Sequence, residues 1–255
     1  MNRFRKTLRK WYYLRNIIQN DVLLASFPKS GNTWVAFLIA NLQKDAYGLR
    51  EEVNFFTIQQ FIPETMEPWG RIPDKPSGQI RVIKTHDAFD SSFRRVIWLV
   101  RDPRKVMRSY FLYLKGMGIV GKDLDFPAFV RLPEFGIGKW LEHSESYARC
   151  ARHHRGVRMF RYEDFIEDPV GQVGIVVRLL GLKDKSLDLE SIVRRCDREA
   201  MLRLEKDTHH SGMREEGPSR YDFVGTERNF PNDPATDEWV MNTCGALLRQ
   251  LGYVP

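Results

Sequence analysis

Short apolar runs alternate with longer segments of helical periodicity through most of the chain. Strands are predicted at 22–25, 82–84, 96–100 and 157–162, because each is a short apolar or β-branched run bounded by polar residues. Helices are predicted at 35–42, from 103 to 114, at 138–152 and at 237–251. This alternation predicts an α/β fold, a single domain with a central parallel β-sheet flanked by helices.

The segment between the first strand and its helix has the composition of an anion-binding loop. Its sequence is Phe27-Pro28-Lys29-Ser30-Gly31-Asn32-Thr33-Trp34. A loop of small residues at a helix N-terminus presents backbone N–H groups to an anion, and one lysine adds a positive charge. The loop lacks the Gly-x-x-x-x-Gly-Lys-Ser/Thr spacing of ATPases. It therefore predicts a P-loop-like site for a phosphate or sulfate ester.

Polar side chains stand at the ends of all four predicted strands. They are Lys29, His86, Arg101 and Tyr162. Ligands of open α/β sheets bind at the carboxyl ends of the strands, so these residues are expected to form one site. Asp102 and Pro103 have the composition of a helix start, with Asp102 as the N-cap.

The net charge of +7 is concentrated at the N-terminus. Residues 1–20 hold six basic residues and no acidic one, and the rest of the chain has 34 basic against 33 acidic residues. A basic face spread over the fold is not predicted, so nucleic acid is not an expected partner. We divide the chain into a basic N-terminal helical segment, 1–20, and one domain, 21–255.

Two interpretations of residues 1–20 stay open. The segment has an apolar helical face, so it could dock on the domain or make peripheral contact with an anionic membrane, the inner membrane surface for example. No signal peptide is predicted, because the apolar run is short and interrupted by Arg15, and no stretch is long enough to span a membrane.

Cysteine and histidine usage gives no metal or disulfide framework. The three cysteines are odd in number and far apart, which predicts a reducing, cytoplasmic compartment. The six histidines include two adjacent pairs, but none has the spacing of a metal site. We expect no metal to be required.

Four motifs resemble those of the sulfotransferases that use 3′-phosphoadenosine 5′-phosphosulfate (PAPS). Residues 27–34 resemble the family's 5′-phosphosulfate loop, and residues 101–110, Arg-Asp-Pro-Arg-Lys-Val-Met-Arg-Ser-Tyr, its 3′-phosphate motif. Lys84-Thr85-His86 resembles the catalytic Lys-Thr-His, and residues 160–164 the Tyr-Glu-Asp segment. The resemblance covers residues 22–164 and implies PAPS as cosubstrate, with adenosine 3′,5′-bisphosphate as product.

The C-terminal third departs from the family's pattern. The family closes over the nucleotide with Arg-Lys-Gly-x-x-Gly, and here only Arg220 and Gly225 match. Arg214, near Gly217, is a second candidate for the contact to the 3′-phosphate. Arg220 is preferred, because Glu215 beside Arg214 would compete for its guanidinium. The departure resembles a bacterial-type member of the family.

The resemblance assigns a role to each matched residue. His86 would be the general base, Lys84 would stabilise the sulfuryl group, and Lys29 the leaving phosphate. Arg101 and Ser109 would bind the 3′-phosphate, and Trp34 and Tyr162 would flank the adenine. The residues expected to bind the nucleotide are Lys29, Ser30, Gly31, Asn32, Thr33, Trp34, Arg101, Ser109, Tyr162 and Arg220.

Other functions remain as alternatives. The main one is a P-loop nucleoside or nucleotide kinase, which would need Mg²⁺ and ATP, and another is a binding module without activity. The acceptor is expected to be a small molecule or a glycan, sulfated on a hydroxyl and less readily on an amine. Its pocket walls are expected from residues 44–80, 115–135 and 205–235. The oligomeric state is not predicted.

Overall fold

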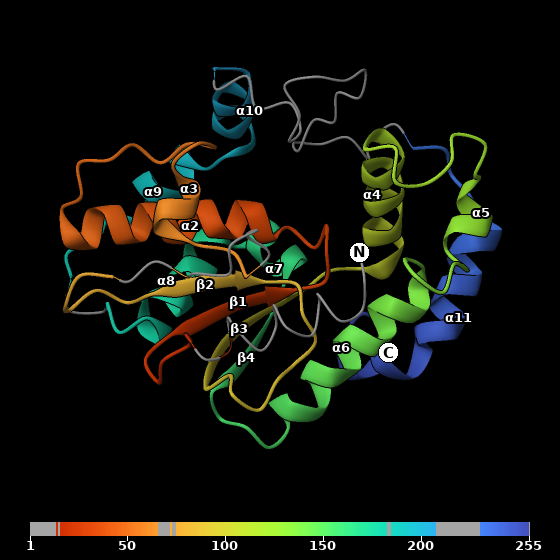
Figure 1. The fold of residues 1–255 in the computed structure, drawn as a ribbon, viewed down its shortest axis with the longest axis horizontal. Helices are drawn as coiled ribbons and strands as arrows, with labels where there is room; N and C mark the ends of the chain where they lie inside the picture. Colours follow the sequence, from red (N-terminus) through yellow and green to blue (C-terminus); the bar gives the residue numbers. More distant parts are fainter. Residues whose placement is uncertain are drawn as a thin grey trace.

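A computed structural model describes residue 14, residues 16–65, residue 72 and residues 75–182, 185–207 and 230–254. One parallel sheet lies at its centre (Figure 1). Its strands are β1 (Val22–Ser26), β2 (Val82–Thr85), β3 (Arg95–Val100) and β4 (Val157–Arg161), in the order β2-β1-β3-β4. The predicted fold class and all four predicted strands are confirmed.

Alternate residues of the strands face two separate cores. Leu23 and Ala25 of β1 pack in one core, and Leu24 packs in the other. The same alternation places Trp98 of β3 in the first core and Leu99 in the second. Because both faces of the sheet are covered, the strands are apolar at nearly every position.

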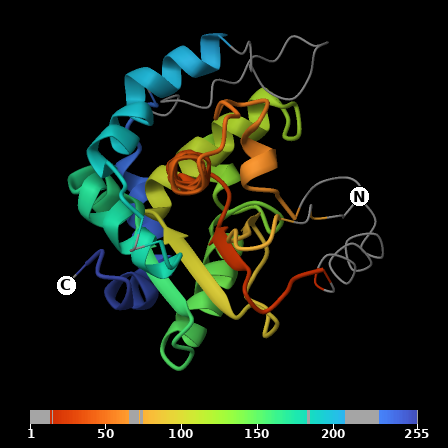
Figure 2. The same ribbon diagram turned by 90° about the vertical axis from the view of Figure 1, so that its left-hand side faces the viewer.

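Helices cover both faces of the sheet, as the two views in Figures 1 and 2 show. The residues of the first core come from α4 (Pro103–Gly116), α5 (Phe126–Phe129), α6 (Ile137–Ala151) and α11 (Pro234–Gln250). The second core takes residues from α2 (Asn32–Tyr47), α3 (Ile58–Phe61), α7 (Tyr162–Glu167), α8 (Pro169–Leu179), α9 (Leu189–Arg195) and α10 (Arg198–Asp207). The four predicted helices correspond to α2, α4, α6 and α11.

The helix start predicted at Asp102 is confirmed. Its side chain accepts a hydrogen bond from the Arg104 amide, and Pro103 is the first residue of α4. Residues 44–80, which were expected to form part of a pocket wall, include the end of α2 and all of α3. Their segment 63–65 pairs with β2: the Lys84 amide donates to the Pro63 carbonyl, and the Thr65 amide to the Lys84 carbonyl. This pairing brings residues 63–65 to the end of β2.

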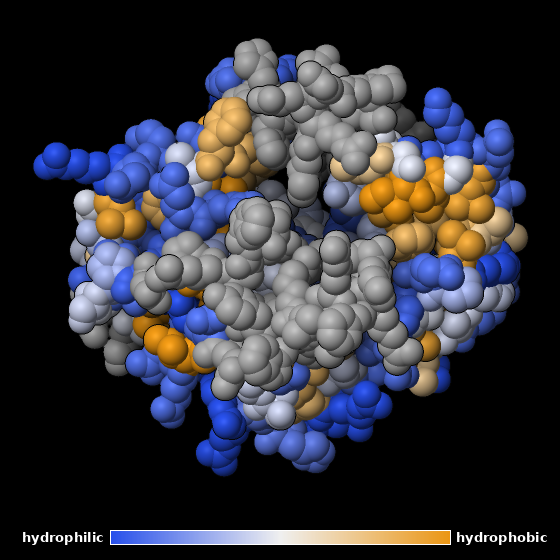
Figure 3. All heavy atoms as spheres, in the orientation of Figure 1, coloured by the Kyte–Doolittle hydropathy of each residue, from blue (hydrophilic) through white to orange (hydrophobic). Residues whose placement is uncertain are grey.

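The exposed large apolar side chains lie on separate elements. Figure 3 shows apolar atoms gathered at the upper right, over α5 and the connection that leads to it, where Ile119 is 52% exposed. Phe56 precedes α3, and Ile166 belongs to α7. No helix among the described residues is long and apolar enough to cross a membrane. Most of the predicted N-terminal segment lies outside the described residues.

Candidate active site

The loop after β1 forms a cradle of backbone amides. Gly31, at φ 92°, is the N-cap of α2, and no side chain caps this helix. Lys29, at φ 67°, is the one non-glycine residue with positive φ in the described part of the chain. Successive turns of this kind direct N–H groups toward one point, and the uncapped helix adds its positive dipole end. The arrangement suits a phosphate or sulfate group.

Two polar side chains of the loop are buried and serve different purposes. The Ser30 hydroxyl has no hydrogen-bond partner among the described residues, so it is available to an anion. The Asn32 amide nitrogen instead donates to Ser26 Oγ at 2.8 Å, which fixes the loop to the end of β1. Any contact of Asn32 with a nucleotide phosphate is therefore expected from its backbone N–H.

Arg101, just after the end of β3, packs between the loop and the first residue of α7. Its guanidinium carbon lies 4.6 Å from the centre of the Tyr162 ring, and its Nη1 donates to the Lys29 carbonyl at 3.2 Å. Gly31 is in contact with the same ring: a Cβ at this position would lie 2.2 Å from Tyr162 Cδ2. Only a glycine allows the loop and the tyrosine to approach so closely.

The two predicted adenine-flanking residues pack against each other. The rings of Trp34 and Tyr162 meet edge to face, with their centres 5.7 Å apart. Trp34 Nε1 donates to the Cys196 carbonyl at 2.6 Å, which holds α2 against the end of α9. Ser109 is buried on α4, with 3% of its surface exposed. These residues lie on α2, α7 and α4, and their contact with a nucleotide stays a prediction.

His86 is held with one ring nitrogen fixed. Its Nδ1 lies 2.8 Å from the Ser26 carbonyl oxygen. A carbonyl only accepts hydrogen bonds, so Nδ1 carries the proton and Nε2 has the free electron pair of a base. Burial, and then the positive charge of Lys84, lower the pKa of His86 below 6.5. The imidazole is therefore neutral and able to accept a proton at pH 7.

Lys84 has a partner that its motif does not include. Its Nζ lies 3.1 Å from Oε2 of Glu64, in the segment beside β2. Lys29 Nζ lies 4.9 Å from the centre of the Tyr113 ring, on α4. The two lysines thus approach the site from the edge strand and from the loop.

A cavity of about 240 Å³ opens beside His86. Its lining includes Phe27 and Pro28 of the loop, Tyr110 of α4 and one face of α6, and the full set is Phe27, Pro28, His86, Asp87, Ala88, Tyr110, Glu134, Lys139, Glu142 and His143. Burial raises the pKa of Tyr110 to about 12, so its phenol stays neutral. Burial and His86 lower the pKa of His143 to about 3, so it is also neutral.

The composition of this cavity wall differs from the sequence-based expectation. Among the described residues of the three segments expected to form it, those of 115–135 contribute, through Glu134. The α6 residues were missed, because nothing in the sequence says which face of that helix packs beside the end of β2. The sequence shows only that α6 is amphipathic, and its polar face would be equally consistent with exposure to solvent.

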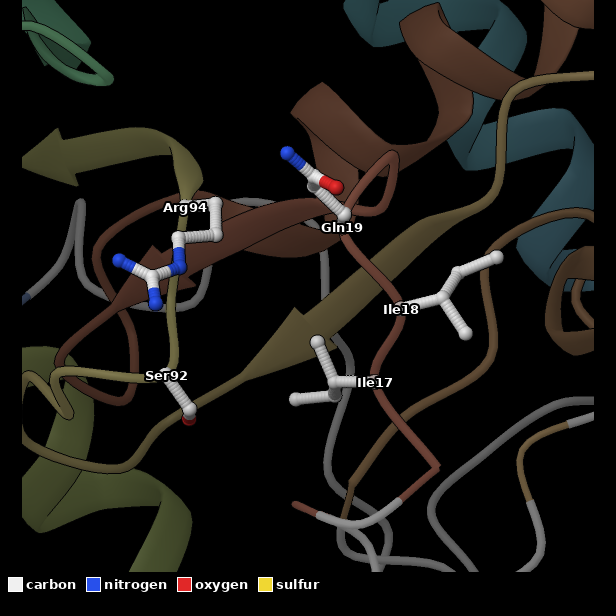
Figure 4. Close-up of a pocket in the computed structure, with 5 residues that line it drawn as sticks. All are labelled: Ile17, Ile18, Gln19, Ser92 and Arg94. Atoms are coloured by element: carbon white, nitrogen blue, oxygen red, sulfur yellow. The ribbon is translucent and has the colours of Figure 1, made fainter.

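A second hollow, of about 520 Å³, lies at the opposite end of the sheet. Figure 4 shows its residues, which come from the segments that precede β1 and β3: Ile17, Ile18, Gln19, Ser92 and Arg94. The loop, His86 and Arg101 all follow the strands instead. Ligands of parallel sheets bind where the strands end, so the candidate site is the His86 cavity with the loop.

Other sequence-based expectations concern residues around the site. The three cysteines are free, as expected. Among the described residues, no group of three or more His, Cys, Asp or Glu side chains could hold a metal ion. Arg214 and Arg220 lie outside the described residues, so the choice between them stays a prediction.

Comparison with known proteins places the chain in a family. The Sulfotransferase domain family matches residues 19–224. Cytosolic sulfotransferase 1 of Danio rerio is 26% identical over 211 residues, which cover 76% of this chain and 70% of that protein. Sulfotransferase 2B1 of Rattus norvegicus is 28% identical over 191 residues, 70% of this chain and 54% of that protein. The chain thus spans between about half and 70% of these relatives.

Solved structures share the fold. A retinol dehydratase in complex with androsterone and the inactive cofactor PAP superposes with a TM-score of 0.64 at 18% identity, over 94% of this chain and 86% of that one. Mouse sulfotransferase SULT7A1 complexed with PAP gives a TM-score of 0.61 at 18% identity, over 95% and 91% of the chains. With the family match over most of its length, the chain belongs to the sulfotransferase domain family, a family of transferases.

Proposed function

We propose that this chain transfers the sulfuryl group of PAPS to a hydroxyl group, less readily to an amine, of a small-molecule or glycan acceptor. One observation carries the proposal. His86, with Nδ1 fixed on the Ser26 carbonyl, lines a cavity that begins at the anion cradle of residues 27–33. A base and an anion site thus meet at the same edge of the sheet, which direct transfer between two bound substrates requires.

The residues of the cradle fit the phosphosulfate group. The buried Ser30 hydroxyl and the uncapped start of α2 offer donors to an anion, and Lys29 would neutralise the leaving phosphate. Arg101 and Ser109 would hold the 3′-phosphate, and Trp34 and Tyr162 the adenine. The structures of the same fold that hold PAP support this choice of nucleotide.

In the proposed reaction, PAPS supplies the sulfuryl group. His86 Nε2 accepts the proton of the acceptor hydroxyl as its oxygen bonds to sulfur and the bond from sulfur to the phosphate oxygen breaks. Lys84 and Lys29 stabilise the negative charge on the oxygens around sulfur and on the leaving phosphate. The protein aligns the attacking and leaving oxygens in line, so no covalent enzyme intermediate is needed.

The acceptor class is supported by the cavity and by the fold. Aromatic rings of Phe27 and Tyr110 and the charges of Glu134, Lys139 and Glu142 line the cavity, which suits a small molecule with apolar and polar parts. The retinol dehydratase of the same fold holds androsterone in one structure and retinol in another. A small-molecule acceptor is accordingly our first choice, with a glycan as the second.

Three further predictions from the sequence stay part of the proposal. The C-terminal departure from the family's pattern favours a bacterial-type member, although the relatives named above are animal proteins. A division between residues 1–20 and 21–255 is retained. We also retain the prediction of a cytoplasmic location with peripheral membrane contact through the basic N-terminus.

The test of the function is sulfuryl transfer without added metal. With sulfur-labelled PAPS and a panel of phenols, alcohols and saccharides, transfer in excess EDTA is expected at nearly the untreated rate, because lysines and amides neutralise the phosphosulfate. A requirement for added Mg²⁺ would contradict this mechanism. Thermal stabilisation by Mg²⁺-ATP, with none by adenosine 3′,5′-bisphosphate, would favour the kinase alternative instead.

A second prediction concerns the 3′-phosphate. Arg101→Ala and Ser109→Ala should each weaken PAPS about tenfold or more, because a charge-assisted hydrogen bond contributes roughly 1.5–3 kcal/mol. Adenosine 5′-phosphosulfate, which lacks the 3′-phosphate, should be affected far less. Calorimetric titration of each variant with both nucleotides measures the difference.

Arg104→Ala is the matched control for Arg101→Ala. Arg104 lies in the first turn of α4, three residues after Arg101, and its guanidinium is paired with Asp102 at 2.6 Å. It should bind both nucleotides nearly as the unsubstituted protein does. Equal losses for the two nucleotides in Arg101→Ala and Ser109→Ala would mean that these side chains shape the loop and do not bind the 3′-phosphate.

A further inference from the structure

Glu64 joins the two polar side chains at the end of β2. Its Oε2 lies 3.1 Å from Lys84 Nζ, and its Oε1 lies 3.7 Å from His86 Nε2. Lys84 and Glu64 are each only 18% exposed, and His86 is 21% exposed. The carboxylate therefore lies between a cation and the proposed base, partly shielded from water.

The backbone holds Glu64 in this place. Residues 63–65 run parallel to β2, and both amide–carbonyl bonds of the pairing involve Lys84, at 2.8 and 3.0 Å. The hydroxyls of Thr65 and Thr85 lie 3.2 Å apart, also in the buried part of this pairing. The position of the carboxylate is thus set by a strand-like segment and not by a free loop.

Several charges act on His86, and Glu64 is the main one that favours its protonated form. Burial and Lys84 lower the pKa of His86, whereas Glu64, the Ser26 carbonyl and Asp87 raise it, in that order. His143, on α6, also faces His86 but is neutral, because its own pKa is about 3. Without Glu64, the positive charge of Lys84 would act on a buried imidazole opposed only by weaker groups.

Only Nε2 can take up a proton, because Nδ1–H is already donated to the Ser26 carbonyl. When a proton moves from an acceptor hydroxyl to Nε2, the new positive charge arises 3.7 Å from the Glu64 carboxylate. This distance is too long for a hydrogen bond but short enough for a strong attraction. Glu64 itself takes no proton in the step.

We propose that Glu64 is a positioning residue of the transfer reaction: it holds Lys84 at the end of β2 and stabilises the imidazolium that His86 becomes on accepting the acceptor proton. This inference rests on the proposed function for its kinetic part. Its electrostatic part concerns His86 and Glu64 alone and can be tested on the protein without any substrate.

The first experiment measures the pKa of His86 by NMR titration of the full chain, with the His86→Asn variant to assign its signal. Glu64→Gln removes the charge with almost no change of shape, and it should lower the pKa of His86 by about one unit. Glu52→Gln is the matched control, because Glu52 pairs with Lys44 at 2.9 Å on the surface, away from the site. It should leave the pKa of His86 unchanged.

Two more variants separate the charge of Glu64 from its effects on Lys84 and on folding. In a Lys84→Met background, Glu64→Gln should still lower the pKa of His86, because the carboxylate then acts alone. Glu64→Asp keeps the charge and should keep the pKa of His86 near its original value. An unchanged pKa in Glu64→Gln, in either background, would overturn the role of Glu64.

The second experiment measures sulfuryl transfer against pH. In Glu64→Gln, kcat should fall about tenfold, and the acid limb of kcat/KM should shift to lower pH by the same amount as the pKa of His86. The affinity for adenosine 3′,5′-bisphosphate should be unchanged. A loss of nucleotide affinity without a pH shift would overturn the inference, whereas absence of transfer by the unsubstituted protein would overturn the proposed function.

Discussion

Replacing His86 by alanine is expected to lower kcat by about a hundredfold or more while the affinity for adenosine 3′,5′-bisphosphate stays nearly unchanged. The base acts on the proton of the acceptor, so its removal affects the chemical step and not nucleotide binding. The geometry supports a loss of turnover without a loss of nucleotide affinity. His86 lines the cavity beside the loop, and its Nδ1 donates to the carbonyl of Ser26, the last residue of β1. Transfer rates and calorimetric affinities of the same preparations give both numbers.

His86→Asn refines this test. The asparagine amide can donate to the Ser26 carbonyl much as Nδ1 does, but it cannot act as a base, so turnover should be lost without loss of stability. His153→Ala, at an exposed site after α6, should leave turnover unchanged. Losses of equal size in turnover and in nucleotide affinity would make His86 a structural residue.

The sign of the pH dependence follows from the direction of the pKa shift. The neutral form of His86 is the active one, and burial and Lys84 place its pKa below 6.5. The value of kcat/KM should be constant near pH 7 and fall as the pH drops through that pKa. The residual activity of His86→Asn should lack this acid limb.

The architecture could be predicted because it depends on local patterns. Strands buried on both faces are short apolar runs, as at 22–26 and 95–100, and the Asp102–Pro103 pair marks where the next helix starts. The ends of parallel strands share one edge of the sheet, so the positions of Lys29, His86 and Arg101 followed from the predicted strands alone. No contact between distant segments had to be known.

The side chains that contact the motif residues come from distant segments of the chain, and the sequence does not reveal which segments these are. Glu64 reaches Lys84 and His86 only because residues 63–65 pair with β2, in a stretch rich in proline that predicts an irregular loop. The α6 wall of the cavity depends on how that helix is rotated on the sheet.

A single methyl group on Gly31 is expected to lower the affinity for adenosine 3′,5′-bisphosphate by about tenfold to a hundredfold. The Cβ of Gly31→Ala would lie 2.2 Å from Tyr162 Cδ2, so the ring has to move. The guanidinium carbon of Arg101 lies 4.6 Å from the centre of that ring, and Arg101 Nη1 donates a hydrogen bond to the Lys29 carbonyl. Displacing the ring therefore disturbs the anion cradle and the proposed 3′-phosphate contact together.

The other end of the same helix provides the control for this variant. Gly48 also has a positive φ, 63°, but a Cβ there would have no neighbour within 4 Å. Gly48→Ala should cost only the backbone strain, about 1–2 kcal/mol of stability, and leave nucleotide affinity unchanged. Gly31→Ala should show the same backbone strain and, in addition, lose roughly 1.5–3 kcal/mol of nucleotide binding free energy, because contacts at the site are disturbed. Calorimetry measures the nucleotide affinity of both variants, and urea unfolding measures their stability. An equal loss of affinity in the two variants would show that contact between the loop and Tyr162 does not shape the nucleotide site.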